Sequence, residues 1–176
     1  MDERTQNLID EYKRQQESCL YTSTTLYEWL KWLRFWKTCF VVAPILLGAV
    51  ATWPLLAHLD AYRWLVGSCA LLAGVTPAVY KALDFDVSLD AIGKNANQLK
   101  MLHDRFRQAW SVAALRPFLE FKKEFGELMT RRDAARGASF TTPERFFTKA
   151  RAKIEAGHYD FAVDSRTATL PKPAGH

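Results

Sequence analysis

Residues 37–81 read "KTCFVVAPILLGAVATWPLLAHLDAYRWLVGSCALLAGVTPAVYK", and only Asp60 and Arg63 are charged between the terminal lysines. The twenty residues 38–57 carry no charge and would span about 30 Å as a helix, which matches the hydrocarbon thickness of a bilayer. Residues 64–80 form a second uncharged run, and six residues join the two. This stretch predicts a transmembrane helical hairpin.

The competing interpretation is a soluble bundle that buries both apolar helices on every side. Such a bundle needs broad apolar faces on the surrounding helices, but the flanking segments show narrow apolar seams. Nearly all of the 24 basic and 19 acidic residues lie outside 37–81, so the chain combines an apolar segment with water-soluble helices. We therefore expect an all-α membrane protein, with a two-span transmembrane helical hairpin and long N- and C-terminal cytoplasmic helices.

Aromatic and basic residues predict how the hairpin lies in the bilayer. The expected interface anchors are Trp29, Trp32, Trp36, Trp53, Trp64 and Tyr80. Four basic residues flank the outer ends of the two runs, whereas the connecting loop holds Arg63 alone. These four are Lys31, Arg34, Lys37 and Lys81. The excess of positive charge predicts that both termini are cytoplasmic, and the first thirty residues lack the apolar core of a signal peptide.

Small, polar and proline residues inside the two runs are candidates for lining a pore or for packing helices together. The candidates are Thr38, Pro44, Gly48, Thr52, Ser68, Ala70, Gly74 and Thr76. Prolines interrupt helical hydrogen bonding, and hydroxyl groups are the polar groups available to a water path. Gly48 with Thr52, and Ala70 with Gly74, are spaced to let two backbones approach closely. Packing within the hairpin and contact between subunits both explain these pairs.

Two apolar seams with heptad spacing flank the hairpin. The first runs from Leu8 to Trp36 and predicts one helix from about residue 4 into the first span. The second runs from Phe85 to Ala113 and includes His103, which we expect to be buried and hydrogen-bonded. The predicted regions are an N-terminal amphipathic helix (1–37), the hairpin (38–80), C-terminal cytoplasmic helices (81–160) and a disordered tail (161–176). We expect the seams to pack on each other and then on neighbouring copies.

A group of arginines near the last expected helix predicts a possible anion or nucleotide contact. Thr142 before Pro143 is expected to cap that helix, and Gly157 to end it. The candidate contacts are Arg131, Arg132, Arg136 and Arg145, which together with free amide groups could hold a phosphate. A solvated basic face near anionic lipid headgroups is the competing explanation.

The sequence contains no arrangement that indicates catalysis. Its four histidines are scattered, and no phosphate loop, serine elbow or H-E-x-x-H motif occurs. Three cysteines give neither a disulfide framework nor zinc-site spacing. Acidic and basic residues are interleaved, which argues against nucleic acid as a partner. We expect no enzyme activity, no catalytic residue, no metal and no cofactor.

The layout resembles that of a known bacterial family. The spans "FVVAPILLGAVATWPLL" and "WLVGSCALLAGVTPAVYKAL", the returning helix "NANQLKMLHDRFRQAW" and the closing "TTPERFFTKARAKIEAGHYD" resemble the SLATT family of two-transmembrane effector domains. The resemblance covers residues 8–160 and implies a multi-pass protein of the bacterial inner membrane. It further implies a homo-oligomer that depolarises the lipid bilayer as a pore in anti-phage defence, in the manner of abortive infection. The trigger would come from a separately encoded sensor or nucleotide-signalling enzyme.

Two other functions compete with a pore. A non-conducting membrane-anchored scaffold would use the hairpin as an anchor and recruit a cytoplasmic partner through its helices. A holin-like lysis protein is the third interpretation, and it is disfavoured because most of the chain lies outside the two runs.

Overall fold

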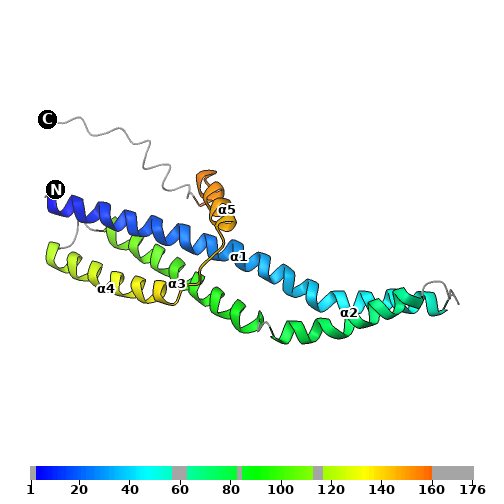
Figure 1. Cartoon of the computed structure of the whole chain (residues 1–176). Coiled ribbons are helices and arrows are strands. Elements are labelled where there is room, and N and C mark those ends of the chain that lie inside the picture. The colour runs from blue at the N-terminus through cyan, green and yellow to red at the C-terminus, as the bar shows by residue number, and fades with distance from the viewer. Residues whose placement is uncertain (1–2, 57–62, 83–84, 113–116, 160–176) are drawn as a thin grey trace.

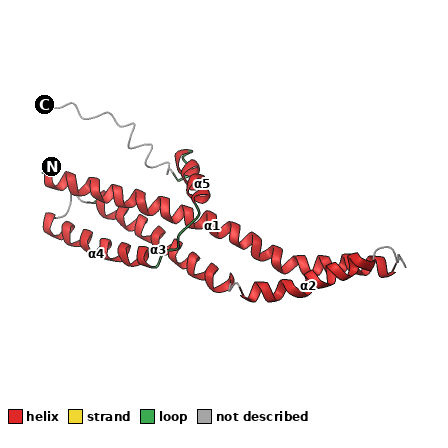
Figure 2. Ribbon diagram, in the orientation of Figure 1, coloured by secondary structure: helices red, strands yellow, loops and turns green. Residues whose placement is uncertain are grey.

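The computed structural model describes residues 3–56, 63–82, 85–112 and 117–159, and within these ranges the chain is all helical (Figures 1 and 2). The helices are α1 (Glu3–Leu56), α2 (Arg63–Ala82), α3 (Phe85–Ser111), α4 (Phe118–Gly137) and α5 (Glu144–Glu155). The predicted tail 161–176, the loop 57–62 and the side chain of Trp53 lie outside the described part of the molecule.

Helix α1 organises the fold because it contacts each of the other four helices. Its 54 residues make it about 80 Å long. No glycine or proline occurs between residues 3 and 43, and the helix continues through Pro44 and Pro54. In Figure 1 its first half lies along α3 and α4, and its second half runs beside α2. We call residues 3–37 of α1 with α3, α4 and α5 the helical body, and residues 38–56 of α1 with α2 the apolar pair.

Tyr12 is the centre of the core of the helical body. Its side chain is fully buried, and its ring stacks on Phe121 with 4.5 Å between ring centroids and 9° between planes. Phe106 and Phe125 meet the same ring edge-on at 5.9 and 4.8 Å. The Tyr12 hydroxyl donates a hydrogen bond of 3.0 Å to the Phe121 carbonyl. One aromatic ring therefore joins α1, α3 and α4.

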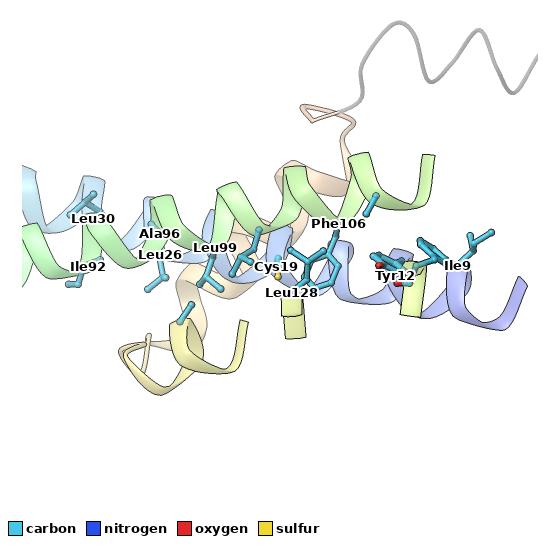
Figure 3. Packing of buried hydrophobic residues seen from close by; sticks show 14 of the residues in the cluster. Ile9, Tyr12, Cys19, Leu26, Leu30, Ile92, Ala96, Leu99, Phe106 and Leu128 are labelled. Carbon is cyan, nitrogen blue, oxygen red and sulfur yellow. Dashed lines mark hydrogen bonds between the residues drawn. The ribbon is translucent and has the colours of Figure 1, made fainter. Parts of the chain in front are cut away.

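The predicted seam on α3 is the buried face of that helix. Figure 3 shows Ile92, Ala96, Leu99 and Phe106 packed against α1 side chains, and all four are buried. His103 is also buried, as predicted, and its Nδ1–H donates to the Gln16 carbonyl at 3.0 Å. Burial lowers the pKa of His103, so the ring is neutral at pH 7. The two seams pack on each other as expected.

The buried face of α1 is wider than its predicted seam around residues 23–28. Ser23, Thr24, Thr25 and Glu28 are buried there although they lie outside the seam. The reason is that α5 crosses α1 at this level and covers a second face of the helix. The predicted seam described the face of α1 that packs on α3, and it did not include the face that packs on α5.

The start of α5 differs from the prediction by one residue, whereas its end agrees. Pro143, rather than Thr142, occupies the N-cap, with φ −61° and ψ 140°, and no side chain caps the helix. The extended ψ of Pro143 keeps it outside the helix, so the predicted threonine cap is wrong. Gly157 has φ 75°, and its N–H donates to the Ile154 carbonyl at 3.0 Å, so it ends the helix as predicted.

Candidate functional site: the apolar helix pair

The apolar pair exposes large hydrophobic side chains along its whole length. Ile45 on α1 is 68% exposed and Leu71 on α2 is 70% exposed. Other exposed residues of the pair are Val41, Val42, Leu46, Val50, Leu72, Val75 and Val79. Both helices are long and apolar enough to cross a membrane, and little of either apolar stretch is buried within the molecule. A buried core helix of a soluble protein has the opposite exposure, and so large an apolar surface marks an interaction site.

The two helices of the pair touch through small side chains. Ala51 on α1 and Cys69 on α2 are buried, and they are the buried hydrophobic residues of the pair within its described side chains. Both have small side chains, which fits a close approach of α1 and α2.

Gly48 and Gly74 have open space where a side chain would begin. A Cβ atom built on either glycine would meet nothing within 4 Å. Their partners in the small-residue pairs, Thr52 and Ala70, are exposed. The described structure therefore shows no close packing at the Cβ positions of the two glycines. They are left available for contact with another helix.

The four hydroxyl side chains proposed for a pore each donate to a carbonyl of their own helix. The bonds are Thr38 to Arg34 (3.0 Å), Thr52 to Ala49 (2.7 Å), Ser68 to Trp64 (2.9 Å) and Thr76 to Leu72 (2.6 Å). Such bonds satisfy the hydroxyl groups without water and are compatible with lipid. Thr38 and Thr52 lie about 20 Å apart along α1, so the two hydroxyl groups of this helix are at different levels.

Aromatic side chains lie at the boundary between the helical body and the apolar pair. Trp32 and Trp36 are 37% and 41% exposed, and their rings meet at 5.8 Å. Trp29, one helical turn earlier, packs partly into the core of the helical body. At the opposite end of the pair Trp64 is 71% exposed. Tyr80, near the end of α2, is half-buried. The exposed rings at both ends have the distribution expected of an interfacial belt.

A buried carboxylate attaches α5 to α1 just before this aromatic boundary. Glu28 is 3% exposed, and three lysine amines contact its carboxylate. The distances are 2.5 Å to Lys153, 2.9 Å to Lys31 and 3.3 Å to Lys149. We call these four residues the Glu28 clasp. Burial raises the pKa of Glu28, but the hydrogen bonds from the three lysines outweigh this effect and lower the pKa from 4.5 to about 2.

Replacing Glu28 by glutamine should loosen α5 and remove one source of acid sensitivity. The carboxylate releases its proton more readily in the folded state, so its stabilising effect is complete above pH 4.5 and is lost as the pH falls through about 2. We expect Glu28→Gln to lower the free energy of unfolding by about 1–2 kcal/mol at neutral pH and by less near pH 3. Urea unfolding of the full chain in micelles, followed by circular dichroism, measures both values.

Glu127 on α4 is exposed and provides the control. Glu127→Gln removes the same charge without touching the clasp, so its unfolding should match that of the unaltered chain at both pH values. Equal stability of the Glu28→Gln protein and the unaltered chain at neutral pH would contradict a stabilising clasp.

The arginines proposed as an anion contact have separate surroundings. Arg132 donates to the Gln15 side chain and pairs with Asp133 at 2.8 Å. Arg136 donates to the Ser18 hydroxyl at 2.6 Å. The guanidinium of Arg145 lies 4.4 Å from the ring centroid of Trp32. Because Ser18 and Trp32 are about 20 Å apart along α1, these side chains do not converge on the start of α5.

Arg131, the fourth proposed contact, lines a cavity between α3 and α4. Sequence reasoning did not find the second arginine of that cavity, Arg105, or the Glu28 clasp. The only local signal for the clasp was the spacing of Glu28 and Lys31, three residues apart on one helix.

Among the described residues, no three His, Cys, Asp or Glu side chains are close enough to hold a metal ion. Comparison with models of protein families, with curated proteins and with solved structures finds no match to this chain.

Proposed function

We propose that this protein is an oligomeric effector that depolarises the bacterial inner membrane by forming a pore when a partner or second messenger triggers it. One observation carries the proposal: a pair of exposed apolar helices extends from a polar helical body. The resemblance to SLATT effectors in layout points to the same role, in anti-phage defence.

The proposed topology is a multi-pass hairpin with both termini in the cytoplasm. Arg34 and Lys37 on α1 and Lys81 at the end of α2 lie at the end of the apolar pair that adjoins the helical body. Positive charge at this end supports a cytoplasmic helical body, and the Trp32–Trp36 boundary would then lie in the inner headgroup layer.

The continuity of α1 supports a direct coupling between trigger and membrane. The same helix carries Tyr12 in the core of the helical body and Ile45 on the exposed apolar surface. A shift of α1 against α3 would therefore move the first span without an intervening hinge. A partner that binds the helical body need not touch the bilayer to act on it.

A water path requires several copies of the chain, since two helices cannot enclose one. A Cβ atom added to Gly48 or Gly74 would meet nothing within 4 Å, so both glycines would let helices of neighbouring copies approach closely. In such a homo-oligomer the Thr38 and Thr52 hydroxyls, and those of Ser68 and Thr76 on α2, are the polar groups that could face water.

The alternative is a non-conducting scaffold anchored by the hairpin, and one observation favours it. All four hydroxyl side chains of the spans bond to their own helices, so they offer little to a water path in the single chain. In a scaffold the helical body alone would do the work by recruiting a partner. Any membrane anchor would then serve.

Subunit contact through Gly48 and Gly74 predicts a loss of permeability when either is enlarged. Gly48→Leu and Gly74→Leu each place the added Cβ atom in open space, so we expect the single chain to fold normally. We expect each change to lower dye release at least tenfold, from vesicles that contain the protein together with its trigger. The same changes should abolish depolarisation of infected cells that express the chain with its neighbouring genes.

Gly126→Leu on α4 is the matched control, since an added Cβ there also meets nothing within 4 Å but lies in the helical body. It should leave permeability unchanged. A chimeric protein in which an unrelated hairpin replaces residues 38–80 tests the alternative. Full protection of infected cells by this chimera would reject the pore and favour the scaffold.

A further inference from the structure

A cavity of about 470 Å³ lies between α3 and α4 in the helical body. Its lining includes Gln98, Met101, Leu102 and Arg105 from α3, and Arg131 and Ala135 from α4. The volume is in the range of small-molecule sites. No acidic residue belongs to the lining among the described residues, so two positive charges share one cavity.

Arg105 and Arg131 differ from the other arginines near α4 in their surroundings. Neither forms an ion pair or a hydrogen bond with a residue in the described ranges. Arg132 and Arg136, by contrast, bind Gln15 and Ser18 on α1. Glu124 on α4 shares a separate, smaller cavity with Arg105 but does not line this one. Two like charges that line one cavity with no acidic residue in its described lining favour a bound anion, and guanidinium groups suit phosphate because they donate in a planar fork.

The lining of the cavity also includes apolar side chains. Met101 is 56% exposed and offers a thioether surface beside Leu102 and Ala135. The buried amide of Asn95 donates a hydrogen bond of 2.7 Å to the Ala135 carbonyl, which fixes α4 against α3 at this level. The Oδ1 atom of the same amide accepts no hydrogen bond within the described part of the chain. The site thus combines two exposed arginines with an apolar surface that a flat group could cover.

In the proposed topology the cavity lies beyond the headgroup layer, which favours a soluble occupant over a lipid headgroup. Gln98 lies thirteen residues into α3, about 20 Å from the end of that helix that adjoins α2. A headgroup layer is only about 5–8 Å thick on each side of a bilayer. We therefore expect an anion that reaches the cavity to come from the aqueous phase.

We infer that the α3–α4 cavity binds a soluble organic phosphate, with Arg105 and Arg131 on the phosphate groups and Met101 against a flat apolar part. Since α3 packs along α1, an occupant lies one helix away from the helix that enters the proposed span. The inference rests on the proposed function in naming a ligand class for the trigger, but binding does not depend on a pore. Failure of the inference would be seen in the binding titration, whereas failure of the proposed function would be seen in dye release from vesicles.

The test is calorimetric titration of the full chain with ATP and with pyrophosphate, in nanodiscs of phosphatidylcholine. We expect saturable binding of ATP below about 1 mM, and at least tenfold weaker binding after Arg105→Gln or Arg131→Gln. Met101→Ala should weaken ATP several-fold and leave pyrophosphate unchanged, because pyrophosphate has no apolar part. Arg4→Gln removes an exposed arginine at the start of α1 and should change nothing.

Circular dichroism establishes that each variant is as helical as the unaltered chain before binding is compared. Absence of saturable ATP binding, or ATP binding that neither arginine substitution weakens, would overturn the inference. Nanodiscs that contain phosphatidylglycerol distinguish the sources of phosphate. Equal ATP affinity in both nanodiscs is expected, whereas displacement of ATP by phosphatidylglycerol would show that a lipid headgroup occupies the cavity.

Discussion

Arginine in place of both Ile45 and Leu71 will drive the chain out of the membrane fraction. Both residues lie near the middle of the expected spans and are exposed in the single chain. Arginine at the centre of a membrane-spanning helix costs about 2.5–3.5 kcal/mol, and the costs of two distant sites should add. We expect Ile45→Arg/Leu71→Arg to lose most of its resistance to alkaline carbonate extraction, and each single variant to lose part of it.

An arginine placed on the helical body is the control, because it adds the same charge outside the expected spans. Leu119 on α4 is 79% exposed, more than either residue of the apolar pair. Leu119→Arg should remain in the membrane pellet, because surface substitutions in water change stability by less than about 0.5 kcal/mol. If Ile45→Arg/Leu71→Arg also stays in the pellet, the apolar pair does not cross the bilayer.

Features that belong to one helix, such as its length, its continuity and its buried face, could be predicted from the sequence. The length of the uncharged runs predicted two apolar helices, and the absence of glycine and proline before Pro44 predicted the continuous α1. The period of the second seam predicted the buried face of α3, including His103. In each case the signal repeats within one helix, so no knowledge of the partner was needed.

Contacts between distant segments could not be predicted in this way. Lys153 reaches Glu28 across 125 residues of sequence, and neither helix shows by its own period that the other lies on it. The same limit applies to the candidate sites. Periodicity placed Gly48 on a small-residue face without saying what covers that face. Nearness in sequence grouped Arg131 with Arg132 and Arg136, although the arginine that shares its cavity, Arg105, comes from another helix.

Truncation of Tyr12 should be the most damaging single change in the helical body. Tyr12→Ala removes the buried ring that joins α1 to Phe106 and Phe121, and the cavity left behind should cost about 3–5 kcal/mol. Tyr12→Phe keeps the ring and loses only the hydrogen bond to the Phe121 carbonyl, at a cost of about 1 kcal/mol. Urea unfolding of the full chain in micelles, followed by circular dichroism, measures both costs.

Membrane extraction of the same variants shows whether the two parts of α1 depend on each other. Phe140→Ala, which truncates an exposed ring outside the helices, is the control and should leave stability unchanged. We expect Tyr12→Ala to stay in the membrane pellet, because insertion depends on residues 38–56 and α2 and not on the core of the helical body. Equal unfolding of Tyr12→Ala and Phe140→Ala would contradict the central place of this ring. A Tyr12→Ala protein that is inserted but no longer responds to its trigger would locate signal reception in the helical body and membrane action in the apolar pair.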